Sequence, residues 1–223
     1  MGVSTLWQKR RRWALVPAIV GAFVMMAGTA KADELRRGGM DPKAGESAVT
    51  LAELADQVNP YGYWIDDTVA GRVWRPRESL VGSEFVPYLT GGWWTQTPLG
   101  RQFGSIWPWG RVVFHYGRWF VDDKFGWVWS PGTVWGSAWV DWRTGDELVG
   151  WSPTPPAELA CRMSPRWVFV PRDALTRVDL ARHVVERESI STAMAETRPG
   201  PQWGVQPLAC KHPQPPDWAT AVG

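Results

Sequence analysis

Residues 116–132 read YGRWFVDDKFGWVWSPG, and this segment contains the clearest structural pattern of the chain. Two short runs of strand-forming residues, 119–121 and 127–129, flank the segment 122–126, which is rich in turn-forming residues and ends in glycine. The arrangement predicts a β-hairpin. Because side chains alternate between the two faces of a strand, the two tryptophans of the second run are expected on the same face of the sheet.

Imperfect copies of this pattern follow one another between residues 61 and 156. Their leading tryptophans, Trp64, Trp94, Trp119 and Trp142, are 30, 25 and 23 residues apart. Such a period is typical of one supersecondary unit per repeat, which cannot bury its apolar face alone. Four hairpins predict a mainly β fold, either an antiparallel sheet or a small barrel of about eight strands, with short flanking helices. The second unit contains an extra turn, which leaves its register open.

Weaker patterns surround the repeats. A capping box at Thr50 and Glu53 predicts a short helix over residues 51–58. Residues 166–171 are expected to form one more strand. Residues 176–188 indicate a short helix, with a strand at 183–185 as the alternative.

The segments outside these elements complete the predicted organisation. The repeat domain with its C-terminal extension is expected to span residues 48–198, and six of the last 27 residues of the chain are proline. Residues 199–223 therefore read as an extended Pro-rich tail.

The N-terminus has the pattern of an export signal. Within residues 1–32, four basic residues at 9–12 precede an uncharged stretch at 13–30, and Ala30-Lys31-Ala32 fits a signal-peptidase site. A retained membrane anchor is the alternative, and only then is membrane contact expected. Residues 33–47 read as a flexible leader. We therefore expect a periplasmic or secreted protein.

The charge balance excludes one class of partner. Of the 24 Lys and Arg residues, five lie in residues 1–32, whereas none of the 22 Asp and Glu residues do. The exported chain therefore carries 19 minus 22, or −3, formal charges. It contains no run of Lys and Arg that could grip phosphates, so nucleic acid is not an expected partner.

The chain has two cysteines, Cys161 and Cys210. An even pair in an exported protein favours a disulfide, which would close a loop of about 50 residues and stabilise the fold by roughly 3–4 kcal/mol. Two free thiols are the first alternative. A metal site is the second, although only Cys210 has a histidine, His212, close by in sequence. No cofactor is expected.

The ordered series of motifs resembles a known family. The motifs are Tyr61-Gly62-Tyr63-Trp64, Val73-Trp74-Arg75-Pro76, His115-Tyr116-Gly117-Arg118-Trp119, Gly126-Trp127-Val128-Trp129 and Gly150-Trp151. Together they resemble a Trp-rich domain of exported bacterial proteins that includes the YXWXP-repeat proteins. The resemblance covers about residues 59–198 and implies an exported Trp-rich domain. It brings no established active site.

The sequence contains no pattern that is typical of a catalytic site. His115 could act as a general base, but a half-buried strand residue hydrogen-bonded across the sheet is the more frequent role for such a histidine. No serine has the Gly-x-Ser-x-Gly frame of a nucleophile elbow. The acidic pairs Asp66-Asp67, Asp122-Asp123 and Asp146-Glu147 lie in predicted turns, where opposed carboxylates are not expected. We therefore predict a non-enzymatic protein.

The aromatic residues are the stronger signal. Tryptophan accounts for 18 of 223 residues. Disordered chains are poor in aromatic residues, so this content excludes disorder for the Trp-rich part of the chain. We expect part of the indoles to form the core and a surplus to stack on the apolar faces of sugars or on Pro-rich peptide. The residues expected to contact a ligand are Trp94, Trp107, Trp109, Tyr116, Trp119, Trp129, Trp142 and Arg118.

Three arginines recur beside the tryptophans: Arg75, Arg118 and Arg143. Each could lie over an indole ring as a cation–π partner, or could join strands structurally.

The sequence is consistent with two functional hypotheses. The first is a binding module of the cell envelope whose ligand is a glycan or peptidoglycan. The second is a structural scaffold that binds an envelope protein. An exposed aromatic patch would favour the first, and buried tryptophans would favour the second.

Overall fold

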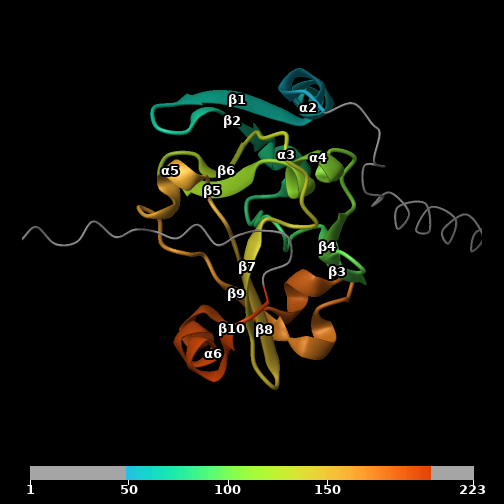
Figure 1. The fold of residues 1–223 in the computed structure, drawn as a ribbon, viewed down its shortest axis with the longest axis vertical. Coiled ribbons are helices and arrows are strands. Elements are labelled where there is room, and N and C mark those ends of the chain that lie inside the picture. Colours follow the sequence, from blue (N-terminus) through green and yellow to red (C-terminus); the bar gives the residue numbers. More distant parts are fainter. Residues whose placement is uncertain (1–48, 202–223) are drawn as a thin grey trace, which may run out of the picture. The chain divides into compact units, whose positions relative to one another are not determined.

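The computed structural model describes residues 49–201, and two antiparallel sheets and a separate hairpin dominate this part of the chain (Figure 1). The first sheet has the strand order β1-β2-β6-β5. Its strands are β1 (Gly62–Asp67), β2 (Gly71–Pro76), β5 (Arg118–Asp122) and β6 (Gly126–Ser130).

The second sheet has the order β10-β7-β8-β9, and the hairpin is formed by β3 and β4. These strands are β3 (Gly92–Thr97), β4 (Gly100–Ser105), β7 (Val140–Thr144), β8 (Leu148–Pro153), β9 (Val168–Pro171) and β10 (Arg198–Pro199). The mainly β, antiparallel prediction is confirmed. The barrel alternative is wrong, because the described strands form separate sheets whose outer strands do not join.

All four predicted hairpins are present. Three of them pair their tryptophans across the strands, as Trp64 with Trp74, Trp119 with Trp129, and Trp142 with Trp151. In the second unit Trp94 pairs with Phe103, and the turn falls between β3 and β4. The extra turn noted in the sequence therefore sets this register.

Short helices connect and flank the strands. They are α2 (Leu51–Val58), α3 (Glu78–Val81), α4 (Gly110–His115), α5 (Ala157–Ala160) and α6 (Ile190–Glu196). The predicted capping box at the start of α2 is confirmed, since the Glu53 amide donates to Thr50 Oγ1 and the Glu53 carboxylate accepts from the Thr50 amide. Strand β9 confirms the strand expected at 166–171.

The segment 176–188 contains two short 3₁₀ turns, η3 (Leu180–His183) and η4 (Arg187–Ser189), in place of an α-helix. The alternative strand at 183–185 does not form either. A backbone hydrogen bond from Val185 N to Phe169 O joins this segment to β9. Two further 3₁₀ turns, η1 (Asn59–Tyr61) and η2 (Arg172–Ala174), join neighbouring elements.

The middle of the first sheet is buried on both faces. Trp74, Trp119 and Trp129 belong to the main core, whereas Val73, Phe120 and Val128 form a second cluster with Leu159. The alternation expected for the hairpin is thus observed, and the face opposite the buried indoles is covered by residues near α5. Coverage of both faces leaves this sheet no exposed row of indoles.

Several rings lie directly against a glycine, and we call these ring–glycine pairs. A Cβ atom added to Gly117 would lie 2.6 Å from Nε1 of Trp129, and one added to Gly136 would lie 2.9 Å from the ring of Trp139. Such separations are well below van der Waals contact. Each ring therefore occupies the space that any larger residue at the glycine position would need.

Candidate functional site

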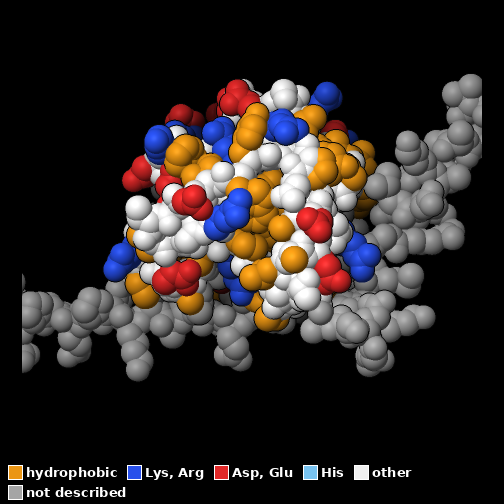
Figure 2. Space-filling view, turned by 90° about the horizontal axis from the view of Figure 1, so that it is seen from above, with side chains coloured by type: hydrophobic (Ala, Val, Ile, Leu, Met, Phe, Trp, Pro, Cys, Tyr) orange, Lys and Arg blue, Asp and Glu red, His pale blue; other side chains and the backbone are white. Residues whose placement is uncertain are grey.

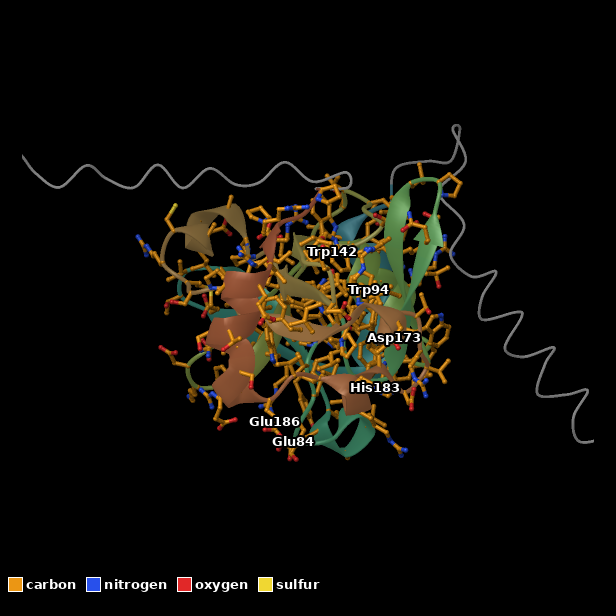
Figure 3. The ribbon with its side chains drawn as sticks, turned by 90° about the horizontal axis from the view of Figure 1, so that it is seen from below. Glu84, Trp94, Trp142, Asp173, His183 and Glu186 are labelled. Carbon is orange, nitrogen blue, oxygen red and sulfur yellow. The ribbon has the colours of Figure 1, made fainter. Side chains whose placement is uncertain are left out.

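Most of the residues predicted to contact a ligand lie in the core. Trp107 and Arg118 are half-buried, and the other six are at most 8% exposed: Trp94, Trp109, Tyr116, Trp119, Trp129 and Trp142. Figure 3 shows Trp94 and Trp142 inside the body of the domain, and their ring centroids are 4.6 Å apart. The prediction that these residues form an exposed aromatic row is wrong, because the layers packed on both sides of them leave their rings no open face.

Several of these aromatic side chains form hydrogen bonds with the C-terminal end of α4. Four consecutive carbonyl oxygens here accept hydrogen bonds from buried aromatic side chains: Val113 from Trp119, Phe114 from Tyr88, His115 from Trp139, and Tyr116 from Trp129. The last carbonyls of a helix have no partner within the helix, and a buried carbonyl without a partner is costly. These aromatic side chains, from the neighbouring β5–β6 hairpin and from the more distant Tyr88 and Trp139, therefore cap the helix.

The recurrent arginines also have structural roles. The Arg118 guanidinium lies over the Trp139 ring, 3.1 Å from its centroid, and burial lowers the pKa of Arg118 to about 10. Arg143 lies over the Trp167 ring at 5.8 Å. The cation–π expectation is confirmed for these two arginines. Arg75 instead forms an ion pair with Glu78, at 3.6 Å.

Arg143 also joins distant segments. Its guanidinium donates to the Thr197 hydroxyl at 3.0 Å and to the Met194 carbonyl at 2.8 Å. A third bond from the same side chain reaches the Thr197 carbonyl. Arg143 on β7 therefore holds the C-terminal end of α6 and the approach to β10.

A cavity of about 210 Å³ opens between the two sheets, and we call it the β5–β8 pocket. Its walls come from Trp119–Val121 of β5, Trp127 of β6, Asp141 of β7, the segment 153–155 at the end of β8, and residues in the loop 160–166. The volume is below the range of about 300–1,000 Å³ that holds a drug-sized ligand. The pocket therefore fits one sugar ring or one or two amino-acid side chains.

The polar groups of the pocket are few and well placed. Thr154 is only 3% exposed, and its hydroxyl has no hydrogen-bond partner among the described residues. A buried hydroxyl without a partner costs roughly 1–3 kcal/mol, a cost that a bound ligand could remove. Asp141 adds a carboxylate to the wall and Arg166 a guanidinium, while Trp127 is half-buried and offers a ring to a ligand.

Thr154, Met163 and Arg166 are pocket residues that were not predicted from the sequence. Thr154 lies between two prolines directly after a Trp-containing strand, and this is the one local signal that could have singled it out. Met163 and Arg166 lie in a loop whose packing against β5 and β6 depends on the tertiary fold.

His115, the candidate general base, lies outside the pocket. It ends α4 instead of lying in a strand, it is 4% exposed, and its Nδ1 is 3.0 Å from the Gly136 carbonyl oxygen. Its ring stacks on Trp135 at 5.7 Å. The contacts are those expected of a structural histidine, although its position in a strand was predicted wrongly.

Several other titratable groups lie toward the outside of the described domain. His183 Nε2 lies 3.3 Å from an Asp179 carboxylate oxygen, and Figure 3 shows Glu84 and Glu186 at the edge of the body. Within residues 49–201, no three His, Cys, Asp or Glu side chains are placed to hold a metal ion. On the face seen in Figure 2, basic and acidic side chains are interspersed around hydrophobic ones that gather in its middle.

Several predictions fall on residues that the structure does not describe. These are the signal peptide, the leader up to residue 47, the tail beyond Pro201, and Cys210. Cys161, at the end of α5, is exposed and forms no disulfide with another described residue. None of the described helices is long and apolar enough to cross a membrane.

The fold and the pocket define a mainly β domain with a tryptophan-rich core. Residues 55–158 match a protein family described as a family of unknown function (DUF6600). The matched segment contains all four hairpins and ends within α5, before the loop that completes the pocket. No curated protein and no solved structure matches the chain.

Proposed function

We propose that this chain is an exported, non-enzymatic binding module of the cell envelope, and that a glycan such as a peptidoglycan fragment binds in the β5–β8 pocket. One observation carries the proposal. Thr154, whose buried hydroxyl has no partner among the described residues, lines a cavity that also presents an indole, a carboxylate and a guanidinium. A protein leaves few buried polar groups unpaired, and a ligand that pairs with this one gains affinity and specificity from it.

The chemistry of the walls suits a sugar. The half-buried Trp127 offers an aromatic surface on which the C–H face of a pyranose can stack, and the Asp141 carboxylate can accept from sugar hydroxyls. Arg166 adds a positive charge that can pair with the carboxylate of a muramic acid or of a stem peptide. The size of the cavity fits a single ring.

The proposal that the protein is not an enzyme is supported by the residues that line the same pocket. A glycosidase needs two carboxylic groups on opposite sides of the scissile bond. Asp141 is the single carboxylate among the described residues that line the pocket, and His115 does not reach it. Export and an envelope location rest on the signal-like sequence at residues 1–32.

The test is calorimetric titration of the purified chain with soluble peptidoglycan fragments. We expect saturable binding, weakened at least 5-fold by Thr154→Val and by Trp127→Phe. The matched controls are Thr133→Val, at an exposed position, and Trp93→Phe, at a half-buried indole outside the pocket. Absence of binding, or equal losses in the controls and the pocket variants, would refute the glycan site.

A structural scaffold remains the second candidate. Its support is that the buried rings of Trp119, Trp129 and Trp139 serve as core and as helix caps. On this view an envelope protein is the partner, and the purified chain would bind no glycan while binding that protein independently of Thr154.

A further inference from the structure

The described chain ends on a path toward the β5–β8 pocket. Strand β10 pairs antiparallel with β7, with Arg198 opposite Thr144 and Pro199 opposite Arg143. The next residue continues the ladder, since the Gly200 amide donates to the Trp142 carbonyl at 2.8 Å. Continuing this register by one residue brings Pro201 opposite Asp141, which lines the pocket.

Cys161 marks the rim of the same pocket. It lies in the sequence between Ala160 and Met163, and both of these residues line the cavity. Its side chain is exposed. Cys210 is nine residues beyond Pro201, and nine extended residues span about 30 Å, so the second cysteine has ample chain length to reach the rim.

The segment that follows Pro201 has a composition suited to the pocket. Residues 203–216 contain Trp203 and four prolines, and Lys211 follows Cys210 directly. Pro-rich segments dock on aromatic-lined grooves because they lose little conformational entropy on binding. The apolar walls and the Asp141 carboxylate complement the prolines and the lysine.

We propose that residues 202–216 dock on the β5–β8 pocket and that a disulfide between Cys161 and Cys210 holds them there. The two thiols lose two protons and two electrons, which pass by thiol–disulfide exchange to an oxidised dithiol catalyst of the export compartment. The docked segment then competes with any ligand of the pocket. The docking is argued from the path of the chain and the two cysteines. The disulfide rests also on the proposed export, and the competition rests on the proposed glycan function.

The docking is tested on the purified full chain by peptide mapping without reductant, followed by hydrogen exchange. We expect a 161–210 linkage, and slower exchange in residues 119–128 and 160–166 in the oxidised chain than after reduction. Cys210→Ser should match the reduced chain, and the hairpin 92–105 serves as an internal control. A chain that remains unlinked in an oxidising buffer, or a linkage that leaves exchange unchanged, would overturn the docking.

A second measurement separates this inference from the proposed function. Peptidoglycan fragments are titrated into the oxidised and the reduced chain, and we expect at least 10-fold tighter binding after reduction. If exchange reports docking but neither form binds the fragments, the glycan function fails and the docking stands. If both forms bind equally, the competition is refuted while the glycan function survives.

Discussion

The hydroxyl of Tyr88 accepts a hydrogen bond from the backbone amide of Trp139, although 51 residues separate them. The same hydroxyl donates to the Phe114 carbonyl at 3.1 Å, so it joins the approach to β7 with the end of α4. Tyr88 is also the one described non-glycine residue with a positive φ, at 61°. A strained backbone of this kind persists where surrounding contacts hold it in place.

Removing this hydroxyl should cost stability. Tyr88→Phe leaves a buried amide and a buried carbonyl without their partner, and we expect a loss of about 1–3 kcal/mol in the free energy of unfolding. Urea denaturation measures it. Tyr63→Phe is the matched control, because Tyr63 is 55% exposed and should tolerate the change. Equal effects of the two variants would contradict the bridging role of Tyr88.

Two glycines with nearly the same backbone conformation should respond differently to alanine. Gly117 and Gly126 have φ values of 66° and 69°, so both substitutions bring left-handed strain of about 1 kcal/mol. Around Gly126 a Cβ meets nothing within 4 Å, whereas at Gly117 it would lie 2.2 Å from the Ser130 carbonyl oxygen. We expect Gly117→Ala to cost at least about 2 kcal/mol more than Gly126→Ala in thermal or urea unfolding. A similar cost for both would show that the ring beside Gly117 moves freely.

Thr154→Val should stabilise the empty protein. The substitution keeps the shape of the side chain and removes a buried hydroxyl that lacks a partner, so we expect a gain of up to about 1 kcal/mol in the absence of ligand. Differential scanning calorimetry would detect the rise in Tm. A lower Tm would mean that the hydroxyl is satisfied within the folded protein, and the pocket would lose its main argument.

Arg143→Lys should release the C-terminal segment. Lysine cannot reproduce the fork in which Nη2 donates to the Met194 and Thr197 carbonyls while Nε donates to the Thr197 hydroxyl. We expect hydrogen exchange in residues 190–199 to accelerate at least 10-fold while the first sheet is unaffected. Arg198→Lys, at an exposed position in the same segment, is the control. Unchanged exchange in the Arg143 variant would disprove the anchoring role.

Asp179 should make stability depend on pH in the acidic range. The hydrogen bond from Arg177, at 2.9 Å, and that from His183 hold the pKa of Asp179 at about 2, below its ordinary value of 3.8. The folded state therefore favours the carboxylate, and this contribution is present above pH 4 and is lost as the pH falls toward 2. The difference between the wild type and Asp179→Asn in urea midpoint should shrink over this interval. A constant difference from pH 5 to pH 2 would contradict the assignment.

The hairpins could be read from the sequence because their information is local. Turn residues such as Asp122 and Gly126 lie at the ends of β5 and β6, and the alternation of Val128 and Trp129 gives the two faces. The cap of α2 is equally local. Each of these features depends on residues no more than a dozen positions apart.

The features that could not be predicted from the sequence depend on contacts between distant residues. The sequence from Gly110 to His115 contains two valines and a phenylalanine, which favour strands, yet it forms a helix. Two of its last carbonyls are capped by Tyr88 and Trp139, which lie 26 and 24 residues away from their partners. The sequence predicted that part of the indoles would be buried but not how many, because the second face of the first sheet is covered by the distant residues Leu159 and Met163. The pocket requires residues from 119 to 166 to meet.

The ring–glycine pairs link the two most conspicuous features of the composition. With 18 tryptophans and 23 glycines, the chain is rich in both the largest and the smallest residue. Gly136 and Trp139 share one volume, so enlarging the first expels the second, and shrinking the second leaves a void beside the first. The two positions of such a pair cannot be substituted independently. A substitution at one that preserves the fold requires a compensating substitution at the other. The domain is therefore expected to diverge by paired substitutions, which keeps tryptophan and glycine content rising or falling together.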